Sequence, residues 1–111
     1  MFAIGNGEAR LIVPAYDKHD NPVNVSEYLR MVCEIAGGAT HSPGNGSWVD
    51  DNGKLICEPV HILDIACDAG SDVERSLADL GAQVAVELDQ DAVYFRDASG
   101  TVHLIEQEDY K

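Results

Sequence analysis

Along the first third of the chain, the hydrophobic and polar positions show the spacing of a strand and then the spacing of a helix. An apolar, partly β-branched run over residues 10–16 predicts a strand that Pro14 limits or places at a sheet edge. A helix is predicted next, because Asn24 and Glu27 have the spacing of a capping box and glycine at position 37 ends helices without strain. Its predicted buried stripe consists of Leu29, Val32, Cys33 and Ala36.

The middle of the chain, residues 39–68, changes to a strand pattern. The tripeptide at positions 51–53, Asp-Asn-Gly, is typical of a tight hairpin turn, since Asn-Gly tolerates positive φ angles. The strand that returns from this turn is predicted over residues 55–67. Its apolar side chains change phase around His61, which predicts a bulge or a twist there.

A second helix and two short strands complete the pattern. Ser71 and Glu74 have capping-box spacing, and the apolar residues that follow share one helical face: Val73, Leu77, Leu80, Val84 and Leu88. Residues 92–96 and 101–105 predict strands around a turn at 97–100. The order predicts an α+β fold, a ferredoxin-like β-α-β-β-α-β sandwich with an antiparallel sheet, two helices on one face and an extra C-terminal hairpin strand. We expect residues 1–111 to form a single acidic domain.

Composition adds a strong electrostatic asymmetry. The chain has 111 residues and a formal net charge of −13. Residues 50–111 carry fifteen of the 20 acidic side chains and four of the 7 basic ones. Such a chain is not expected to bind nucleic acid phosphates directly, because that needs a basic surface. No apolar run approaches the length of a membrane span, no secretory signal is visible, and three cysteines are an odd number, which together predict a reduced, cytoplasmic setting.

Candidate metal and catalytic residues are few. Cys57, His61 and Cys67 have the same parity, but along one strand they would lie about 13 and 33 Å apart, too far for one zinc ion. A metal would need a partner such as His41 or His103 from a neighbouring strand. Acid–base pairs such as His61 with Asp64, or His103 with Glu58, are common by chance in an acidic chain. We therefore predict no catalytic residue, no metal and no cofactor.

Several turn and packing motifs are shared with a known group of proteins. The chain resembles a group of short uncharacterised proteins of bacteriophages and other mobile elements in a pattern made of Val13-Pro14, Asp17, Gly37-Gly38-Ala39-Thr40, Gly44-x-Gly46-x-Trp48, Asp51-Asn52-Gly53, Glu58 and Gln90-Asp91-Ala92-Val93. The pattern spans about 80 residues. The resemblance implies a phage or mobile-element context inside a bacterial host, and it carries no activity and no functional residues.

Charge and resemblance together predict a non-enzymatic accessory protein. We expect it to bind a basic surface of a host nucleic-acid-handling protein, such as a CRISPR defence complex, and to block it by occupying the place of phosphates. The partner-binding residues expected in and around the second helix are Asp64, Asp68, Asp72, Glu74, Asp79, Glu87, Asp89 and Asp91. A high negative charge also serves solubility alone, so this reading stays open.

Two alternatives belong to other classes. Ferredoxin-like domains often pair, and a cleft of such a homodimer, lined by Trp48, Tyr94 and His61, would make a small-ligand-binding module or a small enzyme. A concave pocket with converging polar groups would favour this alternative. Trp48 itself fits either a core position beside the hairpin or an exposed anchor. The second alternative is a structural protein of the virion.

Overall fold

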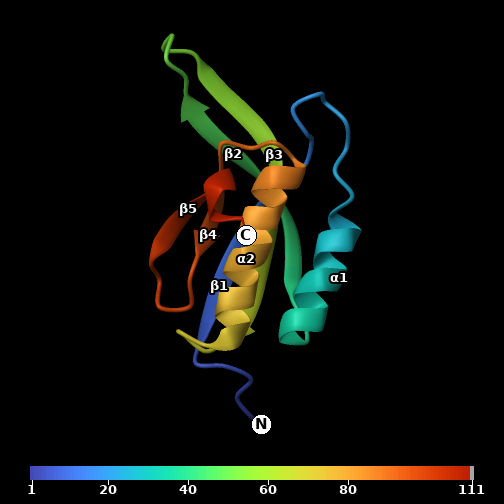
Figure 1. The fold of residues 1–111 in the computed structure, drawn as a ribbon, viewed down its shortest axis with the longest axis vertical. Coiled ribbons are helices and arrows are strands. Elements are labelled where there is room, and N and C mark those ends of the chain that lie inside the picture. Colours follow the sequence, from blue (N-terminus) through green and yellow to red (C-terminus); the bar gives the residue numbers. More distant parts are fainter. Residues whose placement is uncertain (111) are drawn as a thin grey trace.

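The computed structural model describes residues 1–110. In chain order the elements are β1 (Gly7–Pro14), α1 (Val25–Ala36), β2 (Thr40–Val49), β3 (Leu55–Cys67), α2 (Asp72–Glu87), β4 (Ala92–Arg96), β5 (Val102–Glu106) and a short 3-10 helix, η1 (Gln107–Asp109). The five strands form one antiparallel sheet in the order β2-β3-β1-β4-β5, and both helices lie on the same side of it (Figure 1). This confirms the predicted fold class, including the extra hairpin strand.

The sheet has one covered face and one open face. Alternate side chains of a strand point to opposite faces, and the odd-numbered positions of β1, β3 and β4 lie beneath the helices. Leu11 is fully buried there, as is Leu63, its partner on β3. From above, α2 contributes the buried side chains of Leu77 and Val84. The even-numbered positions form the open face. Among the described residues no helix is long and apolar enough to cross a membrane.

The predicted bulge near His61 is wrong. The pairing of β3 runs without interruption against β1, from Gly7 opposite Cys67 to Pro14 opposite Val60, and it is equally regular against β2. The phase change has another cause. Val60 and Ile62 belong to the open face, so the apolar run of β3 supplies both faces of the sheet in one register.

Both helices begin and end near the predicted residues, but their caps differ from the prediction. The Asn24 side chain makes no capping hydrogen bond, whereas Gly37 ends α1 with a φ of 90°. At α2 the Ser71 hydroxyl accepts a hydrogen bond from the backbone N–H of Glu74 at 3.2 Å, as predicted. The Glu74 carboxylate does not return to Ser71. It accepts from the backbone N–H groups of Gly70 and Ala98 instead, at 3.0 and 2.8 Å.

The predicted burial of Cys33 is also wrong. In α1 only Tyr28 and Val32 are buried, and Cys33 is exposed. The helix lies at the side of the helical layer beside α2 (Figure 1). A helix at the side of the layer buries a narrower face than a helix over the middle of the sheet. The apolar stripe of α1 therefore does not show which of its residues are buried.

Candidate functional site

A groove of about 640 Å³ crosses the open face of the sheet. We call it the open-face groove, and its lining includes Ile12, Gly46, Trp48, Glu58, Val60, Gln90, Asp91, Tyr94 and Leu104. These residues come from all five strands and from the turn before β4. The size lies within the range of small-molecule sites.

The shape of the groove follows from the long β2–β3 hairpin. Pairing between β1 and β3 stops at Pro14 opposite Val60, while the hairpin continues beyond this point (Figure 1). Trp48 and Glu58 lie on this extension. Gly46 adds no side chain to the floor of the groove, and a Cβ at this position would make ordinary contact with Val60 at 3.7 Å.

Aromatic rings and carboxylates dominate the chemistry of the groove. The Trp48 side chain is 49% exposed and Tyr94 is half-buried, so both can contact a ligand. Glu58 and Asp91 are exposed carboxylates at the same groove. No Lys, Arg or His among the described residues lines it. Aromatic faces attract onium cations and stack on planar bases, and carboxylates bind ammonium groups and hydroxyls. The groove is therefore suited to a cationic ligand that carries a flat ring.

The groove gathers residues that lie far apart in the sequence. Gly46, Trp48, Glu58 and the Gln90-Asp91 pair belong to the motifs quoted above as turn and packing signatures. The predicted cleft with Trp48 and Tyr94 is present within one chain, but His61 is not part of it. His61 has odd parity, lies on the covered face, and pairs with His41 instead of Asp64. His103 likewise pairs with Asp97 and not with Glu58.

The Gln90-Asp91 rim of the groove is held by its neighbour Asp89. This residue has a φ of 49°, which is unusual for a side chain other than glycine. Its carboxylate forms an ion pair with Lys18 and accepts a hydrogen bond from Gln107 Nε2 at 2.9 Å. These hydrogen bonds lower the pKa of Asp89, with the Lys18 contribution the largest. Gln107 Nε2 also donates to the Gln90 carbonyl oxygen at 3.1 Å, so two distant segments brace the rim.

We expect Asp89→Ala to weaken ligand binding in the groove roughly 3- to 10-fold, because the rim must then be ordered on binding. Asp89→Asn should recover part of the affinity, since asparagine tolerates positive φ and its oxygen still accepts from Gln107. Titration calorimetry with a cationic ligand that carries a flat ring measures this series. Equal affinity of Asp89→Ala and the unaltered protein would show that the rim needs no brace.

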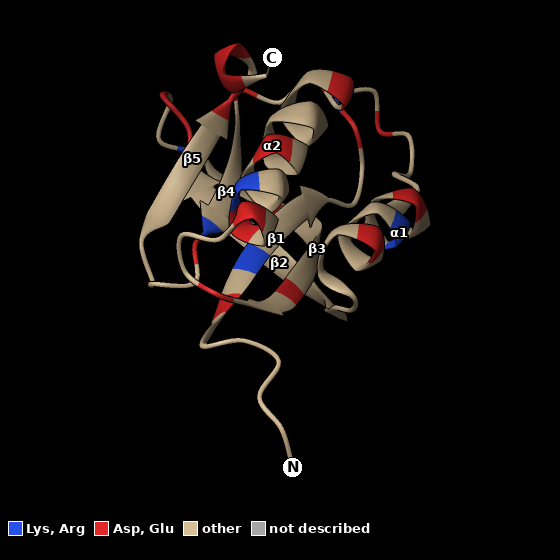
Figure 2. Cartoon of the chain, turned by 60° about the horizontal axis from the view of Figure 1, so that its bottom comes forward, with Lys and Arg blue, Asp and Glu red and all other residues tan. Residues whose placement is uncertain are grey.

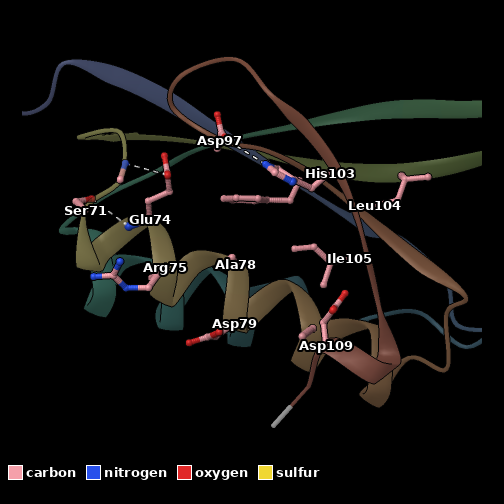
Figure 3. Close-up of a pocket in the computed structure, with 13 residues that line it drawn as sticks. Ser71, Glu74, Arg75, Ala78, Asp79, Asp97, His103, Leu104, Ile105 and Asp109 are labelled. Carbon is pink, nitrogen blue, oxygen red and sulfur yellow. Dashed lines mark hydrogen bonds and ion pairs between the residues drawn. The ribbon is translucent and has the colours of Figure 1, made fainter.

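A second hollow of about 500 Å³ lies between α2 and the β4–β5 hairpin (Figure 3). Two of its carboxylates, Asp97 and Glu74, are occupied by the chain itself. Asp97 accepts hydrogen bonds from the backbone N–H groups of Ser99 and Thr101 and from the His103 ring at 2.9 Å. Glu74 joins the start of α2 to the hairpin through Gly70 and Ala98. These two carboxylates organise turns and are therefore not free to bind a ligand.

The hydrogen bonds to Asp97, of which the one from His103 is the largest cause, hold the pKa of its carboxyl well below the usual value of 3.8. A lowered folded-state pKa stabilises the fold above the unfolded-state pKa. We therefore expect the unaltered protein to be more stable than Asp97→Asn at about pH 5, above the unfolded-state pKa of the carboxyl. This advantage should shrink as the pH falls from 3.8 through the lower folded-state value.

Urea unfolding of both proteins at pH 5 and pH 2.5 measures this difference. Asp91→Asn is the matched control, because the Asp91 carboxylate makes no hydrogen bond within the described residues. A gap between the unaltered protein and Asp97→Asn that does not change with pH would contradict the assignment.

The eight predicted partner-binding carboxylates do not form one surface patch. Asp64 lies on the open face, where it pairs with Arg10 at 2.7 Å, and Asp91 lines the open-face groove. Asp68, Asp72, Glu74 and Asp89 each accept hydrogen bonds from the chain itself, and Glu87 accepts one from Gln83. Asp79 lines the hollow beside α2. Acidic positions are spread over both helices, several loops and the C-terminal turn (Figure 2). The basic partner surface stays an untested prediction.

Comparison with known proteins gives a likeness in structure without one in sequence. No protein-family model and no curated protein matches the chain. A phage SAM lyase solved in complex with S-methyl-5'-thioadenosine superposes with a TM-score of 0.71, covering 100% of this chain and 98% of its own, at 18% identity. The apo structure of a phage SAM lyase gives a TM-score of 0.67 at 18% identity, covering 100% and 97%. The chain thus shares its fold from end to end with a phage protein.

These comparisons correct the predicted function. A non-enzymatic inhibitor is contradicted, because the solved proteins that share the whole fold are named as lyases, one of them with a small molecule bound. The expectation that the chain is not an enzyme is contradicted by the same finding. The small-ligand alternative is better supported, and the concave groove with aromatic and carboxylate groups agrees with it.

Proposed function

We propose that this protein binds S-adenosylmethionine (SAM) in the open-face groove and cleaves it to S-methyl-5'-thioadenosine. The observation that carries the proposal is a groove of aromatic rings and carboxylates on the fold of a lyase solved with that thioadenosine. SAM carries a flat adenine, a sulfonium cation and an ammonium group. The ring faces of Trp48 and Tyr94 can contact the adenine and the sulfonium cation. The carboxylates of Glu58 and Asp91 can bind the ammonium group or the ribose hydroxyls.

The proposed reaction balances without water, metal or redox partner. The bond between sulfur and the carbon chain of the methionine part breaks, and its electron pair stays on sulfur, which becomes a neutral thioether. The released carbon forms its new bond to an oxygen of the substrate's own carboxylate, so a lactone leaves with no proton transferred. The reacting groups are a cation and an anion that neutralise each other. An apolar environment favours such a step, because it removes water from both charges.

The floor of the groove supplies this apolar environment. Ile12 and Val60 are half-buried on the open face, and Leu104, which is 66% exposed, lines the same groove. On β5 the exposed side chain of Val102 continues the apolar surface past the groove. A second copy that covers this face would exclude water from the groove, which agrees with the homodimer expected from the sequence. Light scattering in solution measures the assembly state.

The phage context and the bacterial cytoplasm are part of the proposal. The fold is shared with a phage enzyme, and SAM is a metabolite of the cell interior. Free thiols at Cys33, Cys57 and Cys67 agree with a reducing compartment.

The test is incubation of the purified full chain with SAM and analysis of the products by mass spectrometry. We expect the thioadenosine and the lactone to form in equal amounts, faster than in a blank without protein. Titration calorimetry with S-methyl-5'-thioadenosine measures binding separately. Binding without cleavage would contradict the lyase reaction and leave an adenosyl-binding protein. Absence of both would refute the proposal.

A further inference from the structure

The covered face of the β2–β3 hairpin carries a histidine pair that the open-face groove does not use. His41 on β2 is exposed, and His61 on β3 is half-buried. His41 Nε2 lies 2.9 Å from His61 Nδ1, with ring centroids 4.9 Å apart and the planes inclined by 49°. The register places Pro43 opposite His61, so the two histidines are diagonal neighbours.

The geometry of this pair is close to that of two metal ligands. Imidazole nitrogens bind Zn²⁺ at about 2.0–2.1 Å, and tetrahedral angles then place two such nitrogens roughly 3.3 Å apart. To bind an ion, the two nitrogens must separate by about 0.4 Å and both rings must turn, so that each lone pair points at the ion beside the line that joins the nitrogens. The ring that donates this hydrogen keeps its proton by moving it to its other nitrogen, so the proton count does not change.

We propose that His41 and His61 form a two-histidine site for a divalent transition-metal ion of the Zn²⁺, Ni²⁺ and Cu²⁺ class. Imidazole is a preferred ligand for these ions. Water would fill the remaining positions, because His41 is exposed and no third His, Cys, Asp or Glu of the described residues joins the pair. The net charge of −13 raises the local concentration of cations.

An ion at this site would join β2 to β3 from the face opposite the open-face groove. The same two strands carry Trp48 and Glu58 on the other face. An ion that binds the folded protein and not the unfolded chain would raise the thermal stability by mass action. This site is independent of the proposed SAM cleavage.

The experiment titrates the full chain with Zn²⁺ alone, and then with Ni²⁺ and Cu²⁺, by calorimetry and by histidine NMR signals. We expect His41→Ala to weaken Zn²⁺ binding roughly tenfold or more. Loss of an exposed side chain should leave the fold intact, and His19→Ala is the matched control. The affinity should rise from Zn²⁺ to Cu²⁺.

A second measurement follows the melting temperature with and without Zn²⁺. It should rise for the unaltered protein and for His19→Ala, and stay constant for His41→Ala. Unchanged Zn²⁺ affinity in His41→Ala would overturn the proposal, as would a lack of binding by the unaltered protein. Neither result depends on SAM, so the two proposals fail separately.

Discussion

Trp48→Ala should weaken the binding of S-methyl-5'-thioadenosine roughly 5- to 150-fold. The indole lies half exposed in the open-face groove, and stacking of a base on an aromatic side chain contributes about 1–3 kcal/mol. Trp48→Phe should recover most of the affinity, because a smaller aromatic face remains. Titration calorimetry measures the dissociation constant, and circular dichroism confirms that each variant is folded.

Val49→Ala is the matched control for this prediction. Val49 is the next residue of β2, is 63% exposed, and points to the opposite face of the sheet. Its loss should leave the affinity unchanged. If Trp48→Ala and Val49→Ala bind equally well, the groove is not the adenosyl site. In that case the hollow beside α2 becomes the next candidate (Figure 3).

Leu11→Ala should lower the free energy of unfolding by about 2–5 kcal/mol. Leu11 is fully buried beneath α2, where its Cδ1 would lie 3.4 Å from a Cβ added at Gly81. Removing its side chain leaves a cavity that the close packing of α2 on the sheet cannot fill. The melting temperature should fall by roughly 10–20 °C. Calorimetry and urea unfolding measure both quantities.

Leu104→Ala tests the same chemical change on the other face of the sheet. Leu104 is 66% exposed on β5, so the stability should change by less than about 0.5 kcal/mol. Because Leu104 lines the open-face groove, its loss should instead weaken ligand binding. A large loss of stability in Leu104→Ala, or none in Leu11→Ala, would contradict the assignment of the two faces.

The histidine pairs illustrate how far the sequence could predict the candidate sites. The strand spacing correctly predicts that Cys57, His61 and Cys67 lie too far apart to bind one zinc ion. Their odd residue numbers correctly predict that they point to the same face of the sheet. The partner of His61 depends on the pairing register of β2, which brings in His41 from twenty residues away. This register cannot be predicted from the residues around either histidine. The same holds for His103, whose nearest carboxylate comes from the turn at Asp97.

The open-face groove shows the same limit. The motifs with Gly46, Trp48, Glu58 and Gln90-Asp91 were visible in the sequence, yet each one alone indicates a turn or a packing position. Their meeting depends on the strand order β2-β3-β1-β4-β5 and on the extension of the hairpin beyond β1. Charge counted along the sequence does not show which carboxylates are free, because some of them are bound to groups of the chain itself, as Asp64 is to Arg10.

The sequence by itself determined the order of the elements and the fold class, although the first strand runs over Gly7–Pro14 and not over the predicted residues 10–16. Signals such as Asn52-Gly53, Gly37 and Ser71 act within a few residues, and hydrophobic spacing assigns strands and helices locally. The tertiary structure alone decided which side chains are covered, which meet in the groove and which pair across strands. These properties depend on neighbours that are distant in the chain, and their contact is set by the packing of the whole sheet and its helices.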